Sequence, residues 1–406
     1  MRKLGFIQEN NTKKSVEQTS IIVPKNFTHS YVVGQTGCGK TSSFIYPNLD
    51  DRIKNGHGIL LMDFKGKEHR SAKFFAHKHN RLSDVLEIGT PWGIRTNLIS
   101  NMNEKELKSF VISLMSMKAE NDYWSVSGSN LVISAWKSIK AYKNIIEEAD
   151  KINNKKIYLG VIERFKLPTA LTFAEITNVC KSTVSIASFL NRVQKLSERF
   201  EKTINSKIED WLNRHDEDVV KNKYLDLMTS ILHFKDIVEN ELKSLEVFKD
   251  SLDESNKSSS LTTLIMSMST TFSSVADNKS FNDADGLDLA KELDNGKIII
   301  INAQEISSIV LGNLVSSTLQ ELSKRVRQTK INPVSVFIDE AQRILGGGGS
   351  MDLHAEILRE AKVELFLAFQ SHSLMINALG ESPFKALLLN LVSSYHFKNG
   401  VVVDDL

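Results

Sequence analysis

The segment "HSYVVGQTGCGKTSSFIYPNL", His29 to Leu49, decides the fold. A short β-branched run at residues 31–33 predicts a strand, a glycine-rich turn follows it, and a helical pattern comes next. The turn reads Gly-x-x-x-x-Gly-Lys-Thr, the phosphate-binding loop (P-loop), in the strand–loop–helix setting that this motif requires. Glycines allow backbone N–H groups to surround phosphate oxygens at the N-terminus of a helix. The segment therefore predicts a nucleotide site.

Each residue of this loop has an expected role. The residues expected to bind ATP are Gly34, Gln35, Thr36, Gly37, Cys38, Gly39, Lys40, Thr41 and Ser42. Lys40 is expected to reach the β and γ phosphates, and the Thr41 hydroxyl to ligate Mg²⁺. A glycine-rich turn without a ligand is the alternative. It is disfavoured because the glycines, the lysine and the hydroxyl all keep the spacing of the motif.

A second segment, "PVSVFIDE", supplies the acids that hydrolysis needs. Its continuous apolar run at residues 334–338 predicts a parallel strand that is buried on both faces. Carboxylates at the carboxyl end of such a strand lie where open α/β sheets bind ligands. We expect Asp339 to hold Mg²⁺ and Glu340 to polarise the attacking water, with helix capping as the alternative role for both acids.

A third predicted strand, "VELFLAFQ", covers residues 363–369 and ends in Gln370. In RecA-like ATPases a polar residue at this strand end can contact the γ-phosphate, so Gln370 is expected to sense hydrolysis. The alternative is a polar residue where a strand meets a loop. Together the segments predict an α/β fold, a RecA-like P-loop ATPase domain with a central, mostly parallel sheet.

Composition limits the other possibilities. The chain has 406 residues, 41% apolar and 25% charged, which is typical of a soluble globular protein with more than one core. The net charge of +2 excludes a global field that attracts nucleic acid. Two cysteines, Cys38 and Cys180, favour a reducing cytosol over a disulfide framework. No apolar run approaches the length of about 18 residues that a membrane span needs.

The two nucleotide motifs lie far apart, and the sequence between them is helical. Residues 101–258 are rich in Lys, Glu and Asp with helical periodicity, which predicts an inserted all-α domain. Residues 1–100 and 259–406 are then the two parts of the nucleotide-binding domain, and the polar run at 253–260 is the hinge between them. The all-α domain receives substrates in one interpretation and is a purely structural bundle in the other.

Further segments show a family pattern around these motifs. They are "GILLMDFKGKE", "RTNLIS", "NDYWSVSGSNLVISAW" with Trp124, and "LPTALTFAEI". In this order the chain after about residue 21 resembles the type IV secretion and conjugation coupling ATPases, the TraG/TraD-like branch of the FtsK–HerA superfamily. "DFKGKE" resembles the D-P-K-G-E of that family, with Phe64 in place of the proline and Lys67 inserted, and "RTNLIS" lacks the proline of the family's N-P-L.

The resemblance implies a hexameric ring that hydrolyses ATP. Such a ring moves DNA, relaxase or effector proteins towards a secretion channel built from other type IV secretion components. It works in the cytoplasm at the inner face of the cytoplasmic membrane, through an N-terminal anchor or a partner. The resemblance also implies an arginine that acts in trans on the neighbouring site. Arg359 is the first candidate and Arg343 the second, with an exposed helical arginine as the alternative for both.

Three questions stay open in the sequence. The basic residues Lys324, Arg325, Arg327 and Lys330 either face DNA or, as we prefer, stabilise a helix C-terminus. "GGGGS" at 346–350 is typical of a flexible linker, either an engineered replacement for a loop or a natural pore loop. The alternative functions are a soluble HerA/FtsK-like DNA translocase and a nucleotide-gated cargo adaptor with weak ATPase activity.

Overall fold

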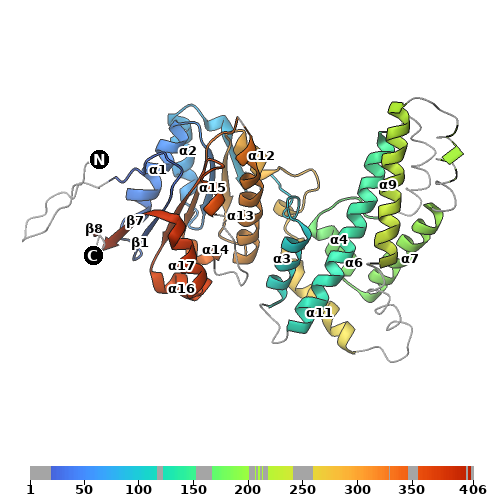
Figure 1. Ribbon diagram of the computed structural model, residues 1–406. Coiled ribbons are helices and arrows are strands. Elements are labelled where there is room, and N and C mark those ends of the chain that lie inside the picture. Colours follow the sequence, from blue (N-terminus) through green and yellow to red (C-terminus); the bar gives the residue numbers. More distant parts are fainter. Residues whose placement is uncertain are drawn as a thin grey trace, which may run out of the picture. The chain divides into compact units, whose positions relative to one another are not determined.

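The chain forms two compact units. The computed structural model describes residues 20–116, 122–151, 167–200, 206, 209–210, 213, 218–240, 259–328, 330–345, 355–398 and 401–403. One unit contains the chain up to Asn101 and again from Asp285, and the other is Met102–Ala284. The first unit carries the sheet and the second is helical (Figure 1). The predicted α/β fold with an inserted all-α domain is confirmed.

The first unit is built on one mixed sheet of mostly parallel strands. The strands are β1 (His29–Gly34), β2 (Gly58–Asp63), β3 (Val85–Ile88), β4 (Ile298–Asn302), β5 (Val334–Asp339), β6 (Val363–Phe369), β7 (Leu391–Lys398) and β8 (Val401–Val403). Their order in the sheet is β3-β4-β2-β5-β6-β1-β7-β8. Every neighbouring pair is parallel except β7 with β8.

Four of the strands form where the sequence is mostly apolar without alternation. All residues of β1, β2, β5 and β6 are buried, as expected for parallel strands covered on both faces. The register aligns the strand ends, because Asp63 pairs with Asn302 and Asp339 with Ala368. The carboxyl ends of four neighbouring strands, β2, β5, β6 and β1, therefore lie along one edge of the sheet.

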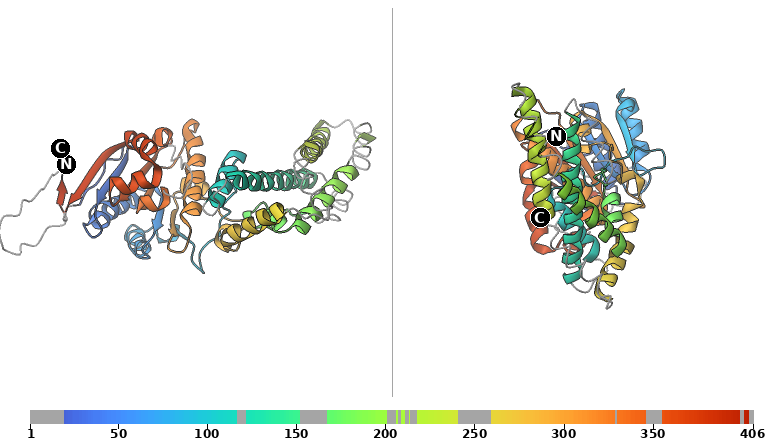
Figure 2. Two further views of the ribbon diagram at one scale, coloured as in Figure 1. Left: turned by 90° about the horizontal axis from the view of Figure 1, so that it is seen from below. Right: turned by 90° about the vertical axis from the view of Figure 1, so that its right-hand side faces the viewer.

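Two groups of helices cover the sheet. The first contains a π-helical turn η1 (Thr41–Ile45), α1 (Tyr46–Lys54) and α2 (Glu68–Lys78). The second contains α12 (Leu289–Asp294), α13 (Ser308–Ser323), α14 (Ala341–Leu345), α15 (Ala355–Leu358), α16 (His372–Leu379) and α17 (Glu381–Asn390). Figures 1 and 2 show α2 on one side of the sheet and α16 and α17 on the other. Phe44, Leu49 and Ala72 of the first group pack in one core with Leu61 and Phe337 of the sheet.

A buried ion pair fixes the helix that follows the P-loop. Arg52 of α1 donates from Nε to Glu364 Oε1 over 2.6 Å and from Nη2 to Glu364 Oε2 over 3.0 Å. Both side chains are fully buried. Because breaking such a pair leaves an unpaired buried charge, the contact holds α1 firmly to β6. The helix that follows the P-loop and η1 is thereby held against the sheet.

The helical unit is held together by packed helix faces. Its longer helices are α3 (Glu104–Ser116), α4 (Asp122–Asp150), α6 (Phe173–Cys180), α7 (Thr183–Arg199), α9 (Asp218–Asn240) and α11 (Ser259–Ala276). Phe173 packs edge-on against Phe110 and Phe272, which joins α6 to α3 and α11. Thr172 and Ser182 cap α6 and α7 by accepting backbone N–H groups.

The second boundary of this unit differs from the expectation. We expected the chain to return to the nucleotide domain at residue 259, but the helical unit extends to Ala284. The reason is that α11 packs against α6, α3 and α4. Most of the proposed hinge, residues 253–258, lies outside the described residues. Within the described part of the chain, no helix is both long and apolar enough to cross a membrane.

Candidate nucleotide-binding site

The P-loop connects β1 to η1 and has the backbone that its glycines permit. Gly37 and Gly39 have φ angles of 84° and 96°, a region that other residues adopt only at a cost. A Cβ atom on Gly34 would lie 2.7 Å from Cys38 Sγ and 2.7 Å from the carbonyl oxygen of Phe397. The loop therefore needs glycine at Gly34 for close packing on β7, and at the other two positions for its turn.

Lys40 lies across this loop. Its buried ammonium donates to the carbonyl oxygens of Gly34 and Gln35, with Nζ to oxygen distances of 2.5 and 3.1 Å. The charge is thus held at the mouth of the loop, where backbone N–H groups and a helix start favour anions. The position fits the phosphate-binding role that the motif predicts for Lys40, which stays a prediction.

Thr41 and Asp339 meet although they lie far apart in the sequence. Thr41 Oγ1 donates to Asp339 Oδ2 over 2.9 Å. The other carboxylate oxygen, Asp339 Oδ1, is buried and has no hydrogen-bond partner among the described residues. A buried polar atom without a partner is costly, so it indicates a ligand or ion that completes the site. A hydroxyl beside a carboxylate is also the oxygen donor set that Mg²⁺ prefers.

Glu340 is held by two glutamine side chains. Its Oε2 accepts from Gln370 Nε2 over 2.9 Å and from Gln342 Nε2 over 2.6 Å. Its backbone φ of 68° is unusual for a residue other than glycine, and such strain is often kept where function requires it. Gln370 thus contacts the predicted base directly. Gln342 was not foreseen, because only the turn into α14 brings it back to Glu340.

Lys65 was also missed as a site residue. It follows β2 in the segment quoted for the family pattern, and its Nζ donates to Asp339 Oδ2 over 2.5 Å. The same Nζ lies 3.7 Å from Glu340 Oε1. Burial opposes the charge of Lys65, but the hydrogen bond to Asp339 outweighs it and the pKa of the ammonium is raised. A cationic side chain therefore lies between the two predicted acids.

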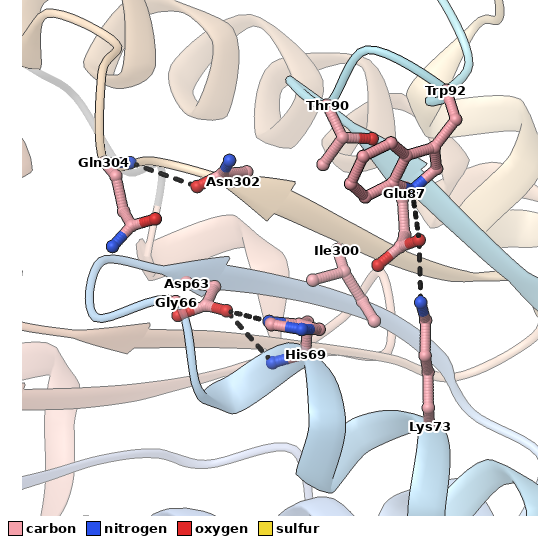
Figure 3. A pocket seen from close by; sticks show the side chains of 10 residues that line it. All are labelled: Asp63, Gly66, His69, Lys73, Glu87, Thr90, Trp92, Ile300, Asn302 and Gln304. Atoms are coloured by element: carbon pink, nitrogen blue, oxygen red, sulfur yellow. Dashed lines mark hydrogen bonds and ion pairs between the residues drawn. The ribbon is translucent and has the colours of Figure 1, made fainter.

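Asp63, at the end of β2, has a different environment. Its carboxylate accepts the backbone N–H groups of Lys65, Lys67 and His69 at 3.2, 3.1 and 3.1 Å. It also pairs with His69 Nδ1 at 2.8 Å (Figure 3). Although burial opposes its charge, the hydrogen bonds from Glu68 and His69 hold the pKa of Asp63 well below its usual range. Burial and the neighbouring Asp63 raise the pKa of Glu68 to about 7.

A small pocket lies beside this acid, with a volume of about 190 Å³. Figure 3 shows His69 and Lys73 of α2 on one side of it and Trp92 on the other. Lys73 Nζ pairs with Glu87 Oε2 over 2.8 Å, and Trp92 Nε1 donates to the same oxygen over 3.3 Å. The charged groups of the pocket are thus paired with one another. None of the residues that line it was predicted as a site residue from the sequence.

The two arginine candidates lie in different places. Arg359 is exposed in the turn between α15 and β6, at the amino end of that strand. It therefore lies at the sheet edge opposite to Asp339, and its predicted action on a neighbouring subunit stays a prediction. Arg343 stacks its guanidinium 5.0 Å from the centre of the Phe64 ring. Arg343 thus covers the loop that carries Lys65.

The basic residues after α13 are partly structural. Arg325 is buried and donates to the Asp294 carboxylate and to the carbonyl oxygens of Asn332 and Ala361. Lys324 pairs with Glu321 one helical turn earlier. The DNA-facing alternative is therefore wrong for Arg325. Residues 346–350, the glycine-rich segment, and the side chain of Trp124 lie outside what the structure describes.

Comparison with known proteins gives the fold. No protein-family model and no curated protein matches the sequence. The chain is similar to the plasmid coupling protein TrwB in complex with ADP and Mg²⁺, with a TM-score of 0.52 and 13% identity over 94% of this chain and 75% of that chain. The comparison with TrwB in complex with the ATP analogue ADPNP gives a TM-score of 0.51 and 14% identity, over 94% of this chain and 74% of that chain. At this identity the likeness shows a shared fold, that of the coupling ATPases which the sequence resembles.

Proposed function

We propose that the chain is an ATP-hydrolysing coupling protein that delivers DNA or protein substrates to a type IV secretion channel. One observation carries the proposal. At the carboxyl edge of the sheet, Thr41 bonds to Asp339 and Gln370 bonds to Glu340, beside a P-loop in which Lys40 donates to the carbonyl oxygen of Gly34. Three segments far apart in the sequence thus meet where a nucleoside triphosphate and its attacking water would lie.

The residues suggest a division of roles. The P-loop backbone and Lys40 would bind the β and γ phosphates. Thr41 and Asp339 would hold Mg²⁺, which when bound neutralises phosphate charge. In the described part of the chain no group of three His, Cys, Asp or Glu side chains is arranged to hold a metal ion. The remaining oxygens around Mg²⁺ would come from phosphate and water, as is usual for this ion at nucleotide sites.

Glu340 would act on the attacking water. Gln370 and Gln342 both donate to Glu340 Oε2, so the other oxygen, Oε1, would be the one to accept a proton from water. Gln370 also bonds directly to Glu340, so a change at the γ-phosphate that moves Gln370 would also move Glu340. Arg359, at the opposite edge of the sheet, would serve the site of a neighbouring subunit in a hexameric ring.

The likeness to TrwB supports the coupling role. It covers 94% of this chain and therefore includes the helical unit as well as the sheet. The named structures of TrwB contain ADP with Mg²⁺ or an ATP analogue, the ligands proposed here. Arg325 and Lys324 are engaged in ion pairs, so these two residues do not support a DNA substrate. A soluble DNA translocase is the second candidate.

The steady-state ATPase rate with and without single- and double-stranded DNA, at low salt, tests the proposal. Lys40→Ala is the control. We expect hydrolysis that depends on Lys40 and rises cooperatively with protein concentration, as a ring requires. Strong DNA stimulation favours a ring motor that acts on nucleic acid, and indifference to DNA favours a protein substrate or an adaptor. A rate that Lys40→Ala leaves unchanged contradicts the proposed site. Normal substrate transfer by Glu340→Gln contradicts the motor role and leaves an adaptor.

A further inference from the structure

The loop between β2 and α2 carries a cation into the predicted nucleotide site. Lys65 Nζ contacts Asp339 Oδ2, the oxygen that also accepts the hydroxyl of Thr41. Among the described residues, Lys65 is the one lysine or arginine paired with Asp339. The ammonium and the Thr41 hydroxyl therefore share one oxygen of Asp339. Thr41 and Asp339 are the two predicted ligands of Mg²⁺.

Charge explains why a cation is favourable there. Asp339 and Glu340 are consecutive and both largely buried, and their carboxylates approach the same ammonium at 2.5 and 3.7 Å. Two such carboxylates repel each other in a medium of low dielectric constant, and a cation between them relieves the repulsion. Lys65 thus supplies the neutralisation that a divalent ion would otherwise provide.

The backbone of the loop is held by several contacts, whereas the lysine side chain extends from it into partly exposed space. Asp63 accepts the backbone N–H of Lys65 and Lys67, which fixes the loop on the end of β2. Gly66 has a φ of 67°, and a Cβ atom there would lie 2.8 Å from Gln304 Nε2. The Lys65 side chain, however, is 40% exposed and has a flexible four-carbon stem. Its ammonium can leave Asp339 while the loop stays in place.

We propose that Lys65 is a positioning residue that competes with the divalent cation for Asp339. The proposal rests on the proposed function, because it assigns the cation position to Thr41 and Asp339. Lys65 neutralises the two acids before nucleotide binds and withdraws when the metal–nucleotide complex enters. The free protein consequently binds a divalent cation weakly, and cation and nucleotide enter together.

The test is the affinity of the nucleotide-free full-length chain for Mn²⁺, measured by electron paramagnetic resonance. Lys65→Met should bind Mn²⁺ about 10-fold more tightly than wild type, because the competing charge is gone. Lys67→Met is the matched control, since Lys67 is exposed in the same loop and its side chain has no ion pair among the described residues. It should leave the affinity unchanged.

Two further variants test whether the gain comes from the lost positive charge and whether it depends on Asp339. Lys65→Arg keeps the charge and should keep Mn²⁺ binding weak, and adding Asp339→Asn to Lys65→Met should remove the gain. Equal affinities of Lys65→Met and wild type, or a gain that survives Asp339→Asn, would overturn the proposal. The readout needs no hydrolysis. A Lys65 effect without ATPase activity would therefore refute the motor while leaving the cation competition intact.

Discussion

Two neighbouring strands of the sheet end in an aspartate, and the two acids differ in how their oxygens are used. Asp63 ends β2 and Asp339 ends β5, and the strands lie side by side. The oxygens of Asp63 are filled by three backbone N–H groups and by His69. Among the described residues, one oxygen of Asp339 accepts from the side chains of Thr41 and Lys65, and the other oxygen has no partner.

The difference shows that a carboxylate at a strand end is not by itself a ligand. Asp63 shapes its own loop, and its lone pairs are satisfied within that loop. Asp339 is contacted by side chains from other segments. Its buried oxygen without a hydrogen bond can be satisfied only by a group outside the described protein atoms. The hydrogen-bond partners, rather than the position at the sheet edge, separate Asp63 from Asp339, the acid that we propose as a ligand of Mg²⁺.

The largest expected effect separates the two glutamates that follow these acids. Glu340→Gln should lower the rate of ATP hydrolysis by about 10²–10⁴-fold, because a neutral amide cannot accept the proton of the attacking water. Glu68→Gln should leave the rate within about 3-fold, because Glu68 is buried against Asp63. Single-turnover hydrolysis of radiolabelled ATP measures both. Equal losses in the two variants would erase the distinction.

The second effect concerns stability. Asp63→Asn should lower the free energy of unfolding by about 2–4 kcal/mol, because the new amide group cannot accept every N–H that now points at it. Asp339→Asn should change it by less than about 1 kcal/mol, since it also relieves the repulsion with Glu340 and the cost of the unpartnered oxygen. Urea denaturation followed by circular dichroism provides the values. A larger loss for Asp339→Asn would reverse our assignment.

The third effect depends on pH. The pKa of Glu68 is raised to about 7 by burial and by Asp63, so its stabilising contribution is complete below its unfolded pKa and is lost as the pH rises through 7. Glu68→Gln cannot ionise and escapes this loss. Relative to wild type, its free energy of unfolding should therefore increase between pH 5 and 8, on the order of 2 kcal/mol.

The comparison with wild type at each pH is needed because other groups titrate too. Burial lowers the pKa of His29, which makes stability rise with pH over part of the same range. That contribution is present in both proteins and cancels in the difference. A difference between the two proteins that stays constant from pH 5 to 8 would show that Glu68 is ionised throughout.

The smallest effect tests the loop between β2 and α2, whose backbone bonds to Asp63 and whose Lys65 side chain bonds to Asp339. Gly66→Ala should cost about 1–2 kcal/mol, because the residue has a positive φ and its Cβ would contact the end of the Gln304 side chain. Gly56→Ala is the matched control, with a φ of 79° and open space around it. It should cost about 1 kcal/mol or less. Thermal unfolding compares them, and a larger cost at Gly56 would argue against a packed loop.

Much of the sheet was predictable because several of its strands contain a continuous apolar run. The runs that form β1, β5 and β6 are typical of parallel strands that are buried on both faces. By contrast, β3 is a short edge strand with Glu87 in the middle, and β7 contains Ser393 and Ser394. Neither has the continuous apolar run by which buried strands are recognised, and neither was predicted.

The site was predictable only as far as its motifs extend. Lys40, Thr41, Asp339 and Glu340 follow segments that predict parallel strands, and the carboxyl ends of such strands form the ligand-binding edge of a sheet. Lys65 and Gln342 act through loops, and their contacts depend on where neighbouring strands end in space. The predicted end of the helical unit was wrong for a related reason. The Ser- and Thr-rich α11 carries no sequence signal that shows on which unit it packs.

The affinity of a fluorescent ATP analogue with and without Mg²⁺, in wild type and in Asp339→Asn, tests the central claim most directly. If Thr41 and Asp339 hold the cation, Mg²⁺ should tighten nucleotide binding to wild type by about 10-fold or more, and Asp339→Asn should abolish most of this gain. An equal gain from Mg²⁺ in both proteins would show that the cation does not lie at the end of β5, and would contradict the account.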